Sequence, residues 1–117
     1  MPAPTTDCLI VERTGSQLVS RLERADGPLT RLFGLMGRAG LPEGSGLWLE
    51  PCASIHMMFM RFSIDVAWLD SKGVVLKVSS KLRPWLGIAF CPGARVALEL
   101  PAEAARDLRP GDRLKPS

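Results

Sequence analysis

The sequence predicts a mainly β protein, of the sandwich or barrel type, with one or two short helices. Apolar and polar side chains alternate over residues 58–68, and a period of two is typical of a strand with one buried face. Turn residues at 70–73 separate this run from a second apolar run at 74–78, which predicts a β-hairpin. A third apolar run at 95–100 follows the turn residues Pro92 and Gly93, and it predicts a further strand.

The remaining elements are indicated by shorter signals. Pro101 is suited to the first turn of a helix, so residues 102–108 are expected to be helical. The other expected elements, in chain order, are an opening strand at 8–11, a strand or helix within 15–24, a short helix at 28–38, a short apolar run at 47–49 and a final strand near 113–114. No internal repeat and no low-complexity linker interrupts this series.

Length and composition are those of an ordinary globular domain. The 117 residues fit a single domain, which we expect to cover residues 1–117. Hydrophobic residues make up 46% of the chain and charged residues 23%, and no apolar run reaches the roughly 18 residues of a membrane span, so a membrane is not an expected partner. The first residues lack the basic region and apolar core of a signal peptide, which predicts a cytoplasmic protein.

The chain has three cysteines, Cys8, Cys52 and Cys91, and they form no CxxC or CxxH pair. An odd number without such pairs indicates neither a disulfide framework nor a zinc ribbon. We therefore expect three reduced and mostly buried thiols.

The formal charge of +3 is unevenly distributed along the chain. Residues 51–117 hold ten basic and six acidic side chains, and residues 72–83 hold four cations and no anion. A basic stripe is one mark of nucleic-acid binding, but a solvated strand face guarded by lysines is the simpler interpretation. Nucleic acid is therefore a disfavoured partner, and the oligomeric state does not follow from the sequence.

Several motifs occur in one order between about Leu32 and Leu114. They are Leu-Pro-Glu-Gly-x-Gly-Leu-x-Leu (41–49), Pro-Cys-x-Ser-Ile-His (51–56), Met-Arg-Phe-x-Ile-Asp-Val (60–66), Leu-Asp-x-x-Gly-x-Val (69–75), Leu-Arg-Pro-Trp (82–85) and Leu-Glu-Leu-Pro (98–101). This order resembles the family called domain of unknown function 192. The resemblance implies a small, mostly β domain of sandwich or barrel type with a short helix or two, and it implies no reaction. Two places depart from the family: Ser63 stands where proline is common, and Met57-Met58 stand where smaller or aromatic residues are common.

One polar cluster is a candidate binding site. The period of two places Arg61 and Asp65 on the face opposite the apolar one. A guanidinium suits planar carboxylate or phosphate groups, and Asp65 could hold it in place. Arg83 lies beside Trp85 in a segment that Pro84 keeps extended. The candidate ligand-binding residues are His56, Arg61, Asp65, Arg83 and Trp85. A purely structural Arg–Asp pair that ties strand to loop is the alternative.

The same segment contains weak candidates for metal ligands. His56, Met58 and Met60 share one face of the predicted strand, and imidazole with thioether suits reduced copper. Cys52 could join them only through a bend at 51–54. Because the face continues as the apolar residues of 62–68, the methionines are better interpreted as core packing. We therefore expect no metal, no cofactor and no catalytic residue, although a pair of Cys52 or Cys91 with His56 would be the nucleophile and base of a small enzyme.

Two classes of function stay open. The preferred one is a non-enzymatic binding or interaction module with a small polar cleft near Arg61. Its partner would be a small anionic ligand, a peptide terminus or another protein. The alternative is a copper-handling protein or a small hydrolase-like enzyme that uses His56 with a cysteine or methionine.

Overall fold

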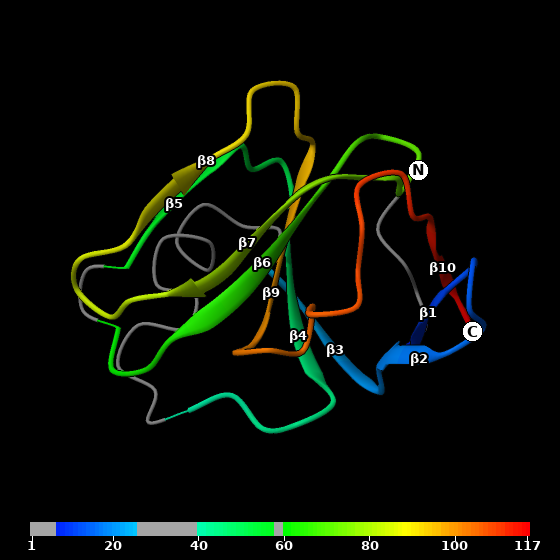
Figure 1. Ribbon diagram of the computed structural model, residues 1–117, viewed down its shortest axis with the longest axis horizontal. Coiled ribbons are helices and arrows are strands. Elements are labelled where there is room, and N and C mark those ends of the chain that lie inside the picture. Colours follow the sequence, from blue (N-terminus) through cyan, green and yellow to red (C-terminus); the bar gives the residue numbers. More distant parts are fainter. Residues whose placement is uncertain (1–6, 26–39, 58–59) are drawn as a thin grey trace.

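The computed structural model describes residues 7–25, 40–57 and 60–117. Ten β-strands and no helix occur within these residues (Figure 1). In chain order the strands are β1 (Leu9–Val11), β2 (Gln17–Val19), β3 (Arg21–Ala25), β4 (Ser45–Leu49), β5 (Ser54–His56), β6 (Ile64–Leu69), β7 (Val75–Leu82), β8 (Ile88–Phe90), β9 (Val96–Pro101) and β10 (Leu114–Pro116). The mainly β fold class is confirmed, and the helix expected at 28–38 lies outside the described residues.

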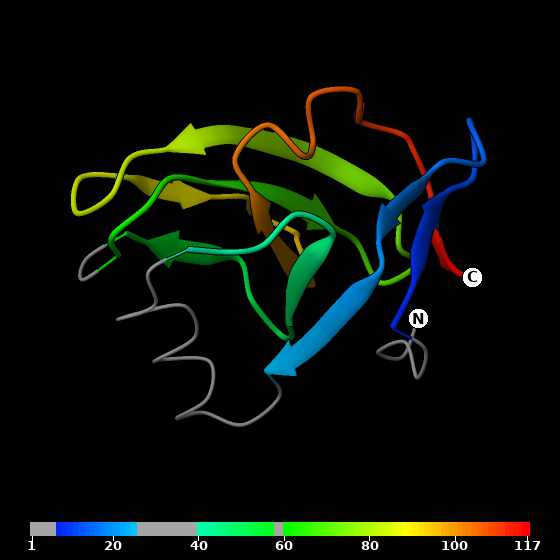
Figure 2. The same cartoon turned by 90° about the horizontal axis from the view of Figure 1, so that it is seen from below.

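The strands are arranged in a large sheet with a smaller one at each end of the molecule. The large sheet has the order β3-β4-β9-β6-β7, and all its pairs are antiparallel except β3 with β4. A three-stranded sheet of order β10-β1-β2 and a two-stranded ribbon of β5 with β8 complete the fold. The two smaller sheets lie toward opposite ends of the long axis (Figures 1 and 2).

The predicted hairpin is confirmed, since β6 pairs antiparallel with β7. The turn between them is held by Asp70, whose Oδ1 accepts the N–H groups of Lys72 and Val74 at 2.8 and 3.0 Å. Gly73 has a φ of +81°, a conformation that glycine adopts without steric cost. The strand predicted at 95–100 is also confirmed, because β9 pairs with the other side of β6.

The expectation of a half-buried strand is wrong for β6. The strand begins at Ile64, and all of its residues are buried. The side chains of Ile64, Val66 and Trp68 join one apolar cluster, whereas Ala67 and Leu69 join another. Because β6 is a central strand covered on both faces, its alternation separates two cores and not core from solvent.

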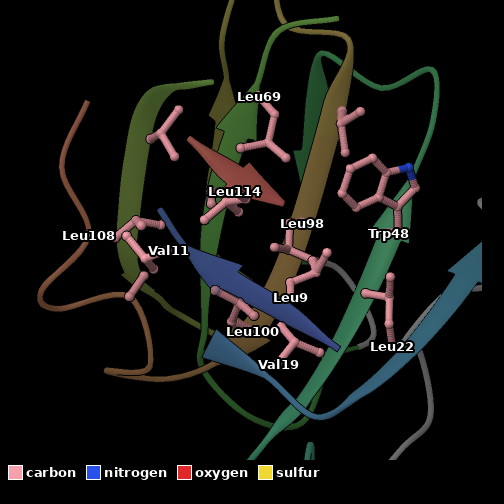
Figure 3. Close-up of a cluster of buried hydrophobic side chains, with 14 residues drawn as sticks. Leu9, Val11, Val19, Leu22, Trp48, Leu69, Leu98, Leu100, Leu108 and Leu114 are labelled. Carbon is pink, nitrogen blue, oxygen red and sulfur yellow. The ribbon is translucent and has the colours of Figure 1, made fainter. Parts of the chain in front are cut away.

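The first of these clusters lies between the large sheet and the three-stranded sheet (Figure 3). Leu9, Val11 and Leu114 from the smaller sheet pack against Leu98 and Leu100 of β9. The second cluster lies between the opposite face of the large sheet and the β5–β8 ribbon. Its buried members are Leu47, Leu49, Met57, Met60, Ile64, Val66, Trp68, Ala89, Cys91 and Ala97. Two apolar layers on one central sheet give the molecule its sandwich-like organisation.

The helix expected at 102–108 is a series of turns. Three N–H groups in this segment bond to the carbonyl three residues back. Glu103 has a φ of +72°, which breaks right-handed winding. The N–H of Ala105 is donated to the carboxylate of Asp65 at 3.0 Å, and a side-chain acceptor of this kind competes with helical hydrogen bonds.

The remaining predicted elements correspond to strands. The opening and final strands are confirmed as β1 and β10, which pair with each other. Residues 15–24, left open between strand and helix, contribute to β2 and β3, and the run at 47–49 belongs to β4. The β5–β8 ribbon was not predicted. In the described part of the chain, no helix has the length and apolar character needed to cross a membrane.

Candidate binding surface

Asp65, unlike Arg61 and Arg83 of the predicted binding set, is buried within the fold. The residue is fully buried in β6. Its Oδ1 accepts the N–H of Lys81 at 2.9 Å, and its Oδ2 accepts the N–H of Ala105 at 3.0 Å. The carboxylate therefore joins β6 to the end of β7 and to the turns at 102–107. Its role in the described contacts is structural, and it cannot meet a ligand or hold Arg61 toward one.

Arg61 and Arg83, in contrast, are both exposed at one end of the β6–β7 hairpin. Because Ile64 pairs with Leu82, the residues that precede β6 and those that follow β7 lie at the same end. Two hydrogen bonds to one carbonyl connect these loops: Met57 O accepts the N–H of Met60 at 3.1 Å and that of Trp85 at 2.8 Å. The structure therefore brings together Arg61, Arg83 and Trp85 from the predicted set.

The loop at 83–87 is tightly constrained. The N–H of Gly87 bonds to Arg83 O at 2.9 Å and the N–H of Leu86 to Pro84 O at 2.8 Å. A Cβ on Gly87 would lie 2.8 Å from Met57 Cγ and 2.9 Å from Arg83 O, so this close approach requires glycine. Trp85 has a φ of +66°, which is rare for a bulky side chain. Backbone strain of this kind gathers at functional sites.

Beyond this loop, apolar side chains point into solvent. Trp85, Leu86, Ile88 and Phe90 are 55%, 75%, 74% and 59% exposed, whereas Ala89 between the last two is buried in the second cluster. We call Arg61, Arg83, Trp85, Leu86, Ile88 and Phe90 the tip surface. The loop between β7 and β8 that carries it forms one end of the long axis of the molecule (left in Figure 1).

The tip surface carries positive charge with no nearby acidic sequence. Its residues fall within the stretches 51–64 and 71–98, and neither stretch contains an aspartate or glutamate. Lys77 on β7 adds a further cation: its Nζ donates to Phe90 O at 3.0 Å and lies 5.7 Å from the centre of the Phe90 ring. Lys81, in contrast, points to another part of the surface, where it pairs with Glu103 at 3.0 Å.

The candidate metal ligands that the structure describes lie in different surroundings, and one of them is buried in the core. Met60 is buried with Met57 in the second apolar cluster, and the thiol of Cys52 donates to Ser54 O at 3.2 Å. His56 pairs with Ile88 through the β5–β8 ribbon, and Met58 lies outside the described residues. Within residues 7–25, 40–57 and 60–117, no group of three or more His, Cys, Asp and Glu side chains could hold a metal ion.

Shallow grooves lie away from the tip surface, between the β1–β2 loop and residues 101–109. Charged side chains here pair with each other. Arg13 Nε lies 2.7 Å from Asp112 Oδ1, and Arg106 Nε lies 3.8 Å from Asp107 Oδ2. Because the charges in the grooves are of both signs and include these ion pairs, the grooves are weaker candidates for recognition of an anionic ligand than the tip surface.

Sequence reasoning missed the apolar half of the tip surface. Leu86, Ile88 and Phe90 belong to an alternating run after Pro84, and alternation alone does not say which parity is buried. The signal that draws attention to this region in the sequence is the stretch 71–98, which contains basic residues and no acidic one, because a field of one sign attracts groups of the opposite sign.

The fold and the surface define a class of protein: a small, mainly β domain with two apolar layers and an exposed basic and apolar end. The chain belongs to the DUF192 family, described as “Uncharacterized ACR”, whose model matches residues 9–116. A UPF0127 protein of Pyrococcus abyssi is 32% identical over 106 residues, which cover 86% of this chain and 88% of that protein. The family assignment agrees with the resemblance found in the sequence motifs.

Two solved structures share the fold. A protein of unknown function from Novosphingobium aromaticivorans superposes with a TM-score of 0.84 at 21% identity, over 98% of this chain and 89% of the other. A protein from Sinorhizobium meliloti, described as a “putative transcription regulator”, superposes with a TM-score of 0.80 at 22% identity, over 97% of each chain. At these identities the similarity establishes a common fold.

Proposed function

We propose that this protein is a non-enzymatic binding domain and that its tip surface holds an anionic group of the partner. The observation that supports this most strongly is the pair of exposed guanidinium groups, Arg61 and Arg83, on loops joined through the Met57 carbonyl. Guanidinium groups bind carboxylate and phosphate through paired hydrogen bonds, and the stretches 51–64 and 71–98 that hold the two arginines contain no acidic residue.

Binding fits this surface better than acid–base catalysis by a carboxylate. The stretches that hold the tip residues contain no aspartate or glutamate to act as a general base. Trp85 instead offers an exposed side chain on the same loop as Arg83, and tryptophan and arginine are common anchors of binding sites. The ligand class is a phosphate or carboxylate, carried by a small molecule, a peptide terminus or a larger partner.

Calorimetric titration with inorganic phosphate, pyrophosphate and citrate at constant ionic strength tests this function. We expect at least one of these anions to bind, and the affinity to fall about tenfold or more in Arg61→Gln and in Arg83→Gln. Lys115→Gln removes an exposed cation from β10, far along the chain from the tip, and is the matched control. Equal losses in all three variants, or no binding of any anion, would contradict the proposal. A melting shift by copper together with stoichiometric bound metal would favour the metal-handling alternative.

A further inference from the structure

We infer that the tip surface docks on an anionic membrane surface, with its apolar side chains in the headgroup boundary and its arginines against lipid phosphates. This inference rests on the proposed function and names the partner of that same site. The sequence predicted no membrane partner, and that expectation rested on the lack of a spanning segment. A peripheral domain needs no such segment, since it can insert a few side chains at the boundary between headgroups and acyl chains.

The exposed apolar side chains of the tip surface have the chemical character of a lipid-contacting surface. Four large apolar residues lie within residues 85–90, all more than half exposed. Soluble proteins seldom gather apolar side chains in this way unless the surface has a partner. Leu86 and Ile88, the most exposed of the four, have no aromatic face, so they would add nothing to base stacking. Aliphatic side chains beside a tryptophan are instead typical of contact with a lipid interface.

The backbone N–H groups of the loop at 84–87 are hydrogen-bonded within the protein. Pro84 has no N–H, and the N–H groups of Trp85, Leu86 and Gly87 are donated to Met57 O, Pro84 O and Arg83 O. Burial of an unpaired N–H in an apolar environment costs free energy. Because the donors of this loop are already paired within the protein, the loop can enter a poorly hydrated layer without stranding them.

The tip surface also carries the positive charge that anionic lipids attract. Arg61 and Arg83 are exposed at the same end of the hairpin as the apolar side chains, and Lys77 Nζ donates to Phe90 O at 3.0 Å. Their long side chains can keep the charged ends at the headgroup level while the apolar residues go deeper. Anionic lipids attract such clusters over about a Debye length. A second copy of the chain is a poorer occupant, because two tips would face each other with like charges.

The position of the β7–β8 loop in the molecule also suits contact with a flat surface. The β7–β8 loop lies at one end of the long axis, and the three-stranded sheet lies toward the other end (Figures 1 and 2). The loop can therefore approach a flat surface while β1, β2 and β10 stay away from it. All twelve acidic residues of the chain lie outside the stretches 51–64 and 71–98, so the loop that approaches the headgroups carries a basic side chain and no acidic one.

Vesicle binding followed through Trp85 tests the inference. Trp48 and Trp68 are buried, so a change in emission on binding reports mainly on Trp85, and Trp85→Phe supplies the background. With vesicles that contain phosphatidylglycerol we expect a blue shift and co-sedimentation. With pure phosphatidylcholine vesicles we expect binding weaker by about tenfold or more.

Paired variants separate this inference from the proposed function. Leu86→Gln with Ile88→Thr removes exposed apolar groups without a change in charge, and should lose vesicle binding while phosphate or citrate binding is kept. Arg61→Gln with Arg83→Gln should lose both, and Lys115→Gln should keep both. Near-ultraviolet circular dichroism of each variant verifies that the core is intact.

Three results would overturn the membrane inference. The first is absence of vesicle binding by protein that still binds small anions, which leaves the proposed function standing. The second is an equal loss of vesicle binding in Lys115→Gln and the tip variants. The third is a Trp85 signal that responds to single-stranded or duplex DNA and not to vesicles, which would assign the tip to nucleic acid.

Discussion

Asp65 illustrates how a polar residue that the sequence suggests for a binding site can instead hold separate parts of the fold together. The alternation of side chains along the predicted strand correctly placed Asp65 on the opposite face from Ile64 and Val66, whose side chains lie in the second apolar cluster. The alternation could not reveal that a second layer covers the face to which Asp65 belongs. The two N–H groups that it binds come from residues 16 and 40 positions further along the chain, and no local pattern predicts such distant partners.

Replacement of Asp65 should therefore affect stability and not binding. In Asp65→Ala two backbone N–H groups lose their acceptor, one of them buried, and we expect a loss of about 3 kcal/mol or more in the free energy of unfolding. Asp70→Ala is the matched control, because Asp70 also accepts two backbone N–H groups but lies at a turn that water can reach. Its loss should be nearer 1 kcal/mol. Urea unfolding measures both, and similar values for the two variants would contradict this account of Asp65.

At the scale of elements, the predictable parts are those defined by local sequence. The β6–β7 hairpin could be predicted because Asp70 and Gly73 supply turn chemistry next to both strands. The β5–β8 ribbon could not, because each strand has three residues and they pair across more than thirty positions. The same limit explains the tip surface: its arginines and tryptophan were found in the sequence, but the ribbon that presents Ile88 and Phe90 was not.

A second element-scale feature joins the β1–β2 loop to the turn before β10. Arg13 donates to both carboxylate oxygens of Asp112, from Nε at 2.7 Å and from the terminal guanidinium nitrogen at 3.1 Å. The hydrogen bond from Arg13 lowers the pKa of Asp112 most, and the backbone N–H of Arg109 at 2.9 Å lowers that pKa further. The carboxylate is thus stabilised in its charged form in the folded state.

This lowered pKa predicts an acid-sensitive contribution to stability. The contribution is complete above the unfolded-state pKa of an aspartate, about 4, and is lost as the pH falls through the lower folded-state pKa. Urea unfolding from neutral to acid pH should therefore show a steeper decline for the native sequence than for Asp112→Asn, which cannot titrate at this position. Parallel curves for the two proteins would show that the Arg13–Asp112 pair adds no pH dependence.

At the scale of the whole molecule, the fold separates a structural end from an exposed end. The three-stranded sheet closes the first apolar cluster, whereas the β5–β8 ribbon closes the second and continues outward as the tip surface. The sequence predicted the fold class because period-two alternation and turns are repeated along the chain. It could not predict the difference between the two ends of the molecule, because that difference depends on which strands end close together in space. The family and the related structures define the fold and name no partner, so the features that favour binding are those of the tip surface.

A two-dimensional NMR titration of the isotope-labelled protein with inorganic phosphate, at constant ionic strength, tests directly whether an anionic partner binds at the tip surface. The largest shifts should occur at the guanidinium groups of Arg61 and Arg83, the indole N–H of Trp85 and the backbone of residues 83–88. Signals from β1 and β10 should stay in place. Shifts concentrated at Arg13 or Lys115, or no shift at the tip under saturating phosphate, would contradict binding at the tip surface.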